Sequence, residues 1–255
     1  MTDSNAFSLE GRVALVTGST TGLGKAIALH LGRAGAKVAL NYANDKGRAS
    51  AALEALRADG IQCDLYRASV IDDRDITELV QTISADMGPI DILVPNATCA
   101  QPQKPIEDYQ WPDYQLMLDY FLKSPMLLTQ AVIGDMKRRR WGRIINIGSE
   151  VFRRGNPNFS AYVAAKGAQE GWTRSMASEL ARWGITVNIV CPGWIPVERH
   201  ENDPQAAKDD YLAGIPMNRW GIPADVASAV AFFASDEAGF MTGQSVQVSG
   251  GITVG

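Results

Sequence analysis

The 255-residue sequence contains only three cysteines and two histidines, which limits the metal and redox sites that it can form. Cys63, Cys99 and Cys191 are odd in number and show no CxxC or Cys/His spacing, so neither a disulfide framework nor a zinc site is predicted. We expect these cysteines to be small buried hydrophobic side chains. A histidine triad or a multi-histidine metal centre would need His30 and His200 in one place, and no metal site is expected.

Long apolar runs and a strong charge of one sign are also missing. No apolar run is long enough to span a bilayer, and residues 1–12 lack the basic and apolar regions of a secretory signal. The net charge of -4 provides no basic surface for nucleic acid. The single basic run, residues 137–140, is typical of a helix C-terminus, where cations complement the helix dipole. The sequence therefore predicts a cytoplasmic protein with no membrane or nucleic-acid partner.

The composition, with 46% hydrophobic and 20% charged residues, is that of an ordinary globular protein. Short apolar runs rich in β-branched residues predict buried strands at residues 13–17, 38–41, 90–94, 143–147, 186–190 and 245–248. Segments with helical periodicity lie between them, at residues 23–34, 46–59, 72–86, 114–139 and 161–182. This alternation predicts an α/β fold with a doubly wound parallel sheet of the Rossmann type, in three α/β/α layers.

No linker, repeat or low-complexity tract divides the chain, so residues 1–255 are expected to form a single domain. Residues 196–216 interrupt the rhythm with a polar segment of mixed charge. This segment follows Pro192-Gly193 at the predicted carboxyl end of a strand, where open α/β sheets bind their ligands. We therefore expect it to be a substrate lid.

Three glycines, Gly18, Gly22 and Gly24, lie between the first predicted strand and the first predicted helix. Glycine allows a backbone to approach a pyrophosphate closely, and free N–H groups at a helix N-terminus stabilise its charge. The alternative is a tight turn without a ligand. The preceding strand and the following helix favour a dinucleotide site.

The spacing T-G-x-x-x-G-x-G resembles that of the short-chain dehydrogenase/reductase family. Further motifs follow in the order of that family: Asn96-Ala97, Ser149, Tyr162 with Lys166, Pro192-Gly193, Arg219-Trp220-Gly221, Thr242-Gly243-Gln244 and Gly250-Gly251. The resemblance covers nearly the whole chain and implies an NAD(P)-dependent oxidoreductase that interconverts a carbonyl and a secondary alcohol.

The resemblance also implies which residues hold the cofactor. They are Gly18, Thr20, Thr21, Gly22, Leu23, Gly24, Asn41, Tyr42, Ser69, Val70, Asn96, Ala97, Tyr162, Lys166, Pro192, Gly193 and Ile195. Ser69 stands where the family carries an adenine-contacting Asp, and Val197 where a Thr often contacts the nicotinamide carboxamide.

The choice between NADP and NAD is read at the end of the second strand, where an acidic residue would repel a 2′-phosphate. Neutral Asn41 is assigned to that position, and Lys46 and Arg48 follow closely. NADP-selective relatives often carry an Arg in the glycine loop, and Thr21 stands at that position here, which argues against NADP. We expect NADP to be preferred, with NAD as the alternative.

Tyr162 and Lys166 are four residues apart on a predicted helix, so their side chains project from the same face. Reduction of a carbonyl needs a proton donor, and tyrosine alone, with a pKa of about 10, is a weak acid. A nearby ammonium is expected to lower the pKa of Tyr162. The resemblance implies that Ser149 binds the substrate oxygen, Tyr162 transfers the proton, and Lys166 holds the nicotinamide ribose.

Phe121 is the largest departure from the family, because an Asn of the catalytic tetrad is expected at its position. In the family that Asn holds, through its backbone carbonyl, a water that connects the catalytic Lys to solvent. A Phe ring cannot fix the local turn as an Asn side chain does. We expect slower proton exchange at Lys166.

The candidate substrate residues are Glu150, Arg154, Trp194 and Arg199. If they face inward, the substrate is small and polar or anionic, such as a sugar, sugar acid or keto acid; if not, they are ordinary surface residues. One alternative is a reductase of carrier-linked 3-oxoacyl thioesters, with residues 137–140 receiving an acidic carrier. Another, based on Phe121, is a cofactor-binding protein with little catalysis. By resemblance the protein is a homotetramer, with interfaces on the helices at 114–139 and 161–182.

Overall fold

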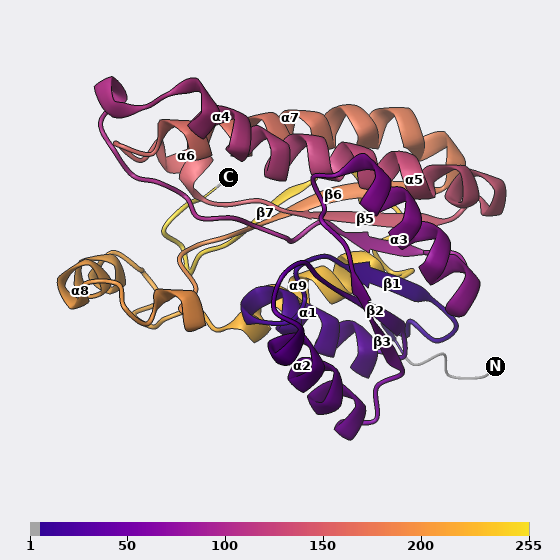
Figure 1. The fold of residues 1–255 in the computed structure, drawn as a ribbon. Helices are drawn as coiled ribbons and strands as arrows, with labels where there is room; N and C mark the ends of the chain where they lie inside the picture. Colours follow the sequence, from indigo (N-terminus) through magenta and orange to yellow (C-terminus); the bar gives the residue numbers. More distant parts are fainter. Residues whose placement is uncertain (1–5, 255) are drawn as a thin grey trace.

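Seven parallel strands form one sheet in the order β3-β2-β1-β4-β5-β6-β7 (Figure 1). The computed structural model describes residues 6–254. The strands are β1 (Val13–Val16), β2 (Lys37–Tyr42), β3 (Cys63–Arg67), β4 (Ile92–Val94), β5 (Gly142–Ile147), β6 (Ile185–Pro192) and β7 (Ser245–Val248). The strand order reverses between β1 and β4, and such a switch point is where open α/β sheets bind ligands.

Helices cover both faces of the sheet, as Figure 1 shows. One face carries α1 (Gly22–Arg33), α2 (Lys46–Ala58) and α9 (Pro223–Ala234). The other carries α3 (Asp73–Asp86), α4 (Trp111–Leu118), α5 (Ser124–Arg139) and α7 (Ser160–Leu180). The predicted three-layer, doubly wound α/β fold is therefore confirmed. No helix within residues 6–254 is long and apolar enough to cross a membrane.

Strand β3 and helix α9 are among the elements that the sequence did not predict. Strand β3 pairs only with β2, and Asp64 and Arg67 are exposed on this edge strand, so it has no continuous apolar run. Helix α9 is rich in small and apolar residues, packs closely on α1, and begins directly at Pro223. Its weak polar face explains why no amphipathic pattern was recognised.

The long helix predicted at residues 114–139 is interrupted by a π-turn over Asp119–Lys123. The Ser124 N–H reaches back five residues to the Asp119 carbonyl. Pro125, the second residue of α5, has no N–H, so the Phe121 carbonyl four residues earlier has no ordinary helical donor. The sequence at Pro125 therefore supports the irregular turn, although no Asn is present there.

Residues 196–216 fold into a short 3₁₀ turn, η4 (Glu198–His200), and helix α8 (Gln205–Ala213). In Figure 1, α8 projects from the edge of the sheet at which the strands end. Tyr211 of α8 stacks on Trp220 at a centroid distance of 5.6 Å and meets Trp194 edge to face at 5.3 Å. These three aromatic rings anchor the segment to the domain, and we keep the name lid for residues 196–216.

Candidate active site

The loop between β1 and α1 is built around glycines that allow backbone segments to touch. A Cβ atom on Gly24 would lie 2.3 Å from the Gly18 carbonyl oxygen and 2.5 Å from Asn96 Nδ2. Gly18 has a φ of 59° and lies against Ala97 in the loop after β4. Both glycines are therefore required by packing and conformation, and the loop lies at the switch point between β1 and β4.

Two buried asparagine side chains hold this loop. Asn41 Oδ1 accepts from the Gly18 N–H at 3.2 Å, and Asn41 Nδ2 donates to the Ala68 and Tyr66 carbonyls at 3.2 and 3.5 Å. Asn96 Nδ2 donates to the Gly18 carbonyl at 3.1 Å. Asn41, only 2% exposed, has both amide hydrogens engaged inside the protein. It therefore supports the loop, whereas Tyr42, the next residue on β2, is only partly buried.

The N-terminus of α1 binds a carboxylate in this structure. Thr21 is the N-cap but forms no side-chain capping bond, and the Gly22 N–H donates to Glu198 Oε2 of the lid at 3.1 Å. Val197 packs beside Gly22. An anion at a helix N-terminus is stabilised by the free N–H groups and the helix dipole. The N-terminus of α1 therefore has an N–H group available to an anion.

The other predicted cofactor residues lie at the carboxyl ends of the strands. The Ser69 N–H after β3 donates to Asp75 Oδ2 at 2.7 Å, and Val70 beside it is buried. Gly193, after β6, donates its N–H to the Val248 carbonyl at 3.0 Å, and Ile195 is buried. Of the remaining ones, Thr20 lies in the loop after β1, Leu23 in the first turn of α1, Ala97 in the loop after β4, and Pro192 at the end of β6.

Ser149, Tyr162 and Lys166 come together where β5 ends and α7 begins. Ser149 follows β5, and its hydroxyl hydrogen-bonds the side chain of Tyr162. Burial raises the pKa of Tyr162, and this effect exceeds the opposing effects of the Ser149 hydrogen bond and of the Arg199 charge. The expectation that the pKa of Tyr162 is lowered is therefore wrong for this structure. A protonated Tyr162 is the form that donates a proton to a carbonyl.

Lys166 is a buried amine, 3% exposed, on the first half of α7. Its Nζ donates to the Ile147 carbonyl at 2.7 Å and to Gln169 Oε1 at 3.1 Å. Burial lowers the pKa of Lys166 to about 7, and the nearby Arg199 charge acts in the same direction. Lys166 therefore titrates near neutral pH.

The ring of Phe121 occupies the space beside these two residues. Lys166 Nζ lies 3.9 Å from its centroid, and the Tyr162 ring meets it edge to face at 5.2 Å. Phe121 is 3% exposed and sits within the π-turn. The residue that replaces the expected Asn thus contacts both the proton donor and the lysine.

Two candidate substrate residues form an internal pair. Glu150, 3% exposed, accepts through Oε1 from Arg154 at 3.1 Å and from the Tyr211 hydroxyl at 2.6 Å. The Tyr211 hydroxyl also accepts from the Trp194 N–H at 2.7 Å. Glu150, Arg154 and the Trp194 N–H therefore attach the lid to the end of β5.

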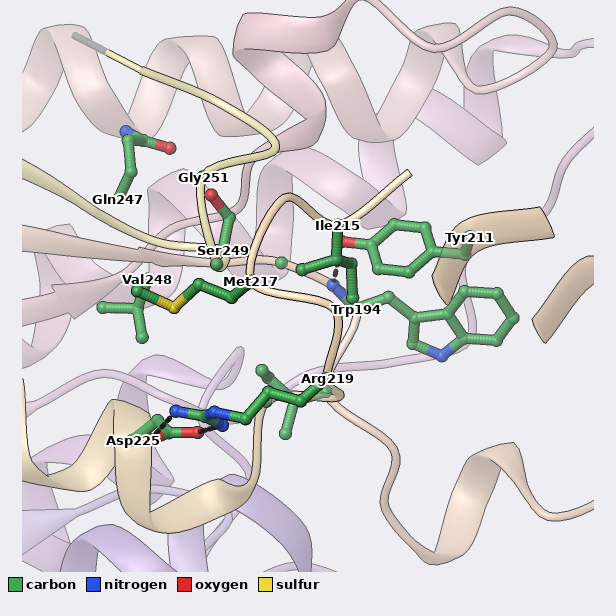
Figure 2. Close-up of a pocket in the computed structure, with 14 residues that line it drawn as sticks. Trp194, Tyr211, Ile215, Met217, Arg219, Asp225, Gln247, Val248, Ser249 and Gly251 are labelled. Carbon is green, nitrogen blue, oxygen red and sulfur yellow. Dashed lines mark hydrogen bonds and ion pairs between the residues drawn. The ribbon is translucent and has the colours of Figure 1, made fainter. Parts of the chain in front are cut away.

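Figure 2 shows the cavity of about 310 Å³ that lies between the loop after β6, the lid and the C-terminal segment. Trp194 and Tyr211 line one side, and Met217 and Ser249 the other. Its only charged lining groups, Arg219 and Asp225, pair with one another at 2.8 Å. This cavity therefore offers no unpaired charge to a ligand.

The basic run at residues 137–140 lies far from the site. It ends α5 immediately before β5, at the amino edge of the sheet, whereas Ser149 follows the carboxyl end of β5. A six-residue strand such as β5 spans about 20 Å. Arg139 also pairs with Asp91, and Arg138 with Asp135. The basic run therefore lies at the opposite edge of the sheet from Ser149.

Comparison with known proteins shows which family the chain belongs to. A family model described as enoyl-(acyl carrier protein) reductase matches residues 18–253. The 3-oxoacyl-(acyl-carrier-protein) reductase of Staphylococcus epidermidis is 38% identical over 241 residues, 94% of this chain and 98% of that protein. The corresponding reductase of Haemophilus influenzae is 39% identical over 247 residues, 96% of this chain and 99% of that protein. The chain belongs to the short-chain dehydrogenase/reductase family.

Two solved structures from Agrobacterium tumefaciens are similar along their whole length. One, provisionally described as a gluconate dehydrogenase, has a TM-score of 0.92 and 31% identity, covering 97% of this chain and 98% of its own. The other, a 3-oxoacyl (acyl-carrier-protein) reductase with NADP bound, has a TM-score of 0.88 and 32% identity, covering 96% and 95%. As a short-chain dehydrogenase/reductase, the protein is an NAD(P)-dependent oxidoreductase.

Several residues of this short-chain dehydrogenase/reductase were not found from the sequence. Gln169, Glu198 and Tyr211 contact the lysine, the glycine loop and Glu150 respectively. Only Gln169 carried a signal, since it lies one helical turn after Lys166. Within residues 6–254, His, Cys, Asp and Glu side chains form no cluster that could hold a metal ion.

Proposed function

We propose that this oxidoreductase uses NADP to interconvert a small carbonyl compound and its secondary alcohol, and that the substrate carries an anionic group such as a carboxylate. The observation that carries the proposal is Arg199, an exposed lid cation whose charge acts on Tyr162, Lys166 and Cys99. A lid cation whose charge acts on the proton donor favours a negatively charged substrate.

Arg199 is available for such a role. Its Nε donates to His200 Nε2 at 3.0 Å, and among residues 6–254 no carboxylate forms an ion pair with it. Burial and the Arg199 charge lower the pKa of His200, so this neighbour is neutral at pH 7. The two terminal nitrogens of the guanidinium can therefore bind a carboxylate in a bidentate manner.

In the direction of carbonyl reduction, each catalytic residue has one role. Ser149 donates a hydrogen bond to the substrate carbonyl oxygen, and Tyr162 gives its proton to that oxygen as the carbonyl is reduced. Protonated Lys166 stabilises the phenolate that Tyr162 becomes. The bound nicotinamide supplies the hydride. The glycine loop and the α1 N-terminus would hold the pyrophosphate, since they already bind a carboxylate.

Replacing Arg199 tests the substrate class. Arg199→Ala is expected to raise KM for a keto acid or sugar acid by roughly 10- to 100-fold, because a charge-assisted bond contributes about 1.5–3 kcal/mol. The effect on kcat should be much smaller. Steady-state kinetics with matched anionic and neutral substrates measure both.

Lys208→Ala is the matched control, since Lys208 is a lid cation whose Nζ donates to the Glu201 carbonyl at 3.0 Å. It should leave KM unchanged. Equal losses in the Arg199 and Lys208 variants, or an Arg199→Ala variant that loses as much with neutral substrates, would remove the support for an anionic substrate.

NADP is favoured over NAD by the charges around the end of β2. Lys46 and Arg48 open α2, and Arg67 at the end of β3 donates to the Ala43 carbonyl at 3.1 Å. No acidic residue occupies the last two positions of β2, Asn41 and Tyr42. Since the Asn41 amide is used to hold the glycine loop, we assign the discrimination between the cofactors to Tyr42 and these cations.

The unmodified enzyme is expected to show a higher kcat/KM with NADPH than with NADH. Tyr42→Asp should reverse the preference, because a carboxylate there repels the 2′-phosphate. Asn41→Asp is a poor test, since it would place a carboxylate against the Tyr66 and Ala68 carbonyls. Equal or better kcat/KM with NADH in the unmodified enzyme would contradict the assignment.

A second candidate function is the reduction of a 3-oxoacyl thioester. It is favoured by the curated relatives and by the NADP-bound neighbour, all of which carry that activity in their names. A panel containing a 3-oxoacyl thioester, keto acids and sugar acids separates the two functions. Turnover of the thioester alone would select the second.

We also propose that the enzyme is a cytoplasmic homotetramer, with α5 and α7 at the interfaces. Partly buried Trp172 and Met176 on α7 and exposed Leu116 on α4 are apolar side chains that support this assembly. Light scattering on the purified protein gives the number of subunits.

A further inference from the structure

The ammonium of Lys166 has three neighbours at the buried end of the site. The Ile147 carbonyl lies 2.7 Å from Nζ, Gln169 Oε1 lies 3.1 Å away, and the centroid of the Phe121 ring lies 3.9 Å away. Both hydrogen-bond acceptors are neutral. The ring attracts a cation through its face but cannot accept a transferable proton. Hydrogen bonding of Lys166 therefore depends on Ile147 and Gln169.

Gln169 is a buried amide, 1% exposed, on the same face of α7 as Lys166. Burial of an amide is unfavourable unless its polar atoms find partners. The partner of its side-chain oxygen is Lys166 Nζ. Its backbone carbonyl accepts from the Thr173 hydroxyl at 2.8 Å, which in turn accepts from Asn146 Nδ2 at 2.9 Å. These bonds connect the backbone of α7 at Gln169 to β5, whereas the Gln169 side-chain oxygen contacts Lys166.

The charged groups around Lys166 do not supply an anion. Tyr162 on α7, Cys191 on β6 and Cys99 in the loop after β4 all have a pKa that burial raises, so they are uncharged at neutral pH. Arg199 of the lid is a cation and disfavours a second positive charge. The hydrogen bonds that support protonated Lys166 thus come from the two neutral acceptors, and the Phe121 ring adds a cation–π contact.

We propose that Gln169 is a positioning residue for Lys166. Its amide oxygen holds Nζ beside Tyr162, keeps the lysine protonated to higher pH, and supplies the polar contact that the Phe121 ring cannot give. The inference rests on the proposed function, in which protonated Lys166 stabilises the phenolate formed when Tyr162 gives up its proton. One consequence is that the pKa of Lys166 depends on which side chain occupies position 169.

Two substitutions at Gln169 shift the protonation of Lys166 in opposite directions. Gln169→Met removes the acceptor at similar volume, so the pKa of Lys166 falls. Gln169→Glu keeps the shape and adds a carboxylate, so the pKa rises by about one unit or more. The pH at which carbonyl reduction declines should shift in the same two directions, and kcat of the Met variant should fall by roughly tenfold.

The pKa is measured directly in protein containing ¹³C-labelled lysine, by titrating the Cε resonance that is missing from Lys166→Met. Thr173→Val is the control, because it removes a hydroxyl from the same buried network without touching Lys166. We expect the Thr173 variant to titrate as the unmodified protein does. If the Met variant does not fold, the test depends on the Glu variant, in which the pKa of Lys166 must rise.

Unchanged titration in both Gln169 variants, shifts of the same sign, or an equal shift in Thr173→Val would overturn the inference. The resonance reports on Lys166 without any substrate, whereas turnover by the unmodified enzyme tests the proposed function. The inference about Gln169 and the proposed function can therefore fail separately.

Discussion

Tyr162→Phe is expected to lower kcat by about 10²- to 10⁴-fold, the usual contribution of a general acid or base, and to leave cofactor binding nearly intact. The substitution removes the hydroxyl that transfers the proton and retains the ring. That ring packs on Phe121 and Phe159 at centroid distances of 5.2 and 4.9 Å, so the local structure should survive. Single-turnover kinetics and nicotinamide fluorescence titration measure the two effects.

Tyr114→Phe is the matched control for this variant. The Tyr114 hydroxyl hydrogen-bonds Ser160 at the start of α7, 2.8 Å away, and takes no part in the proposed proton transfer. Its loss should leave kcat close to the unmodified value. A Tyr162→Phe enzyme that keeps more than about a tenth of kcat would show that Tyr162 is not the proton donor.

Lys166→Met is expected to lower kcat by roughly 10²-fold or more, because the phenolate of Tyr162 loses its neighbouring cation. The unmodified enzyme should also reduce carbonyls more slowly as the pH rises through about 7, where Lys166 loses its proton. The Met variant should lack this decline. A flat pH profile in the unmodified enzyme would contradict the role of the protonated lysine.

The pH dependence of stability provides a second, independent measurement on the Lys166→Met variant. The pKa of Lys166 is about 7 in the folded protein and 10.5 in an ordinary lysine, so between these values the unfolded chain binds more protons. The stability of the unmodified enzyme therefore gains from this residue as the pH rises through that window. The melting temperature of the Met variant, relative to the unmodified enzyme, should fall as the pH rises. A difference that is independent of pH would show that Lys166 is not a destabilising buried charge.

The sheet and the glycine loop could be predicted because local patterns encode them. Buried parallel strands are short apolar runs, and the spacing of Gly18, Gly22 and Gly24 follows from a close backbone approach. Ser149, Tyr162 and Lys166 could be predicted from their spacing and their order along the chain. Edge strand β3 has no continuous apolar run, since part of its surface is exposed to solvent.

The contacts that distinguish this site join residues far apart in the sequence. Glu150 and Tyr211 are separated by 61 positions, and Gly22 and Glu198 by 176. Whether a polar residue faces a ligand or the interior is decided by packing, as Asn41 shows. Its amide turns inward to the glycine loop, although its place at the end of β2 suggested a contact with the cofactor.

Phe121 was correctly identified as a departure from the family, but its surroundings required the structure. Pro125 supports the π-turn without an Asn, and the ring of Phe121 lies against Lys166. Gln169 Oε1 then provides a polar contact to Lys166 that the Phe121 ring cannot give. This compensation joins α7 with the π-turn, two segments about fifty residues apart, so neither position alone predicts it.

Turnover of NADPH with a panel of keto acids, sugar acids and 3-oxoacyl thioesters tests the central claim most directly. The account predicts saturable oxidation of NADPH by at least one anionic carbonyl compound, and loss of that activity in Tyr162→Phe. Binding of NADPH, seen as a change in its fluorescence, without turnover of any carbonyl compound would contradict it.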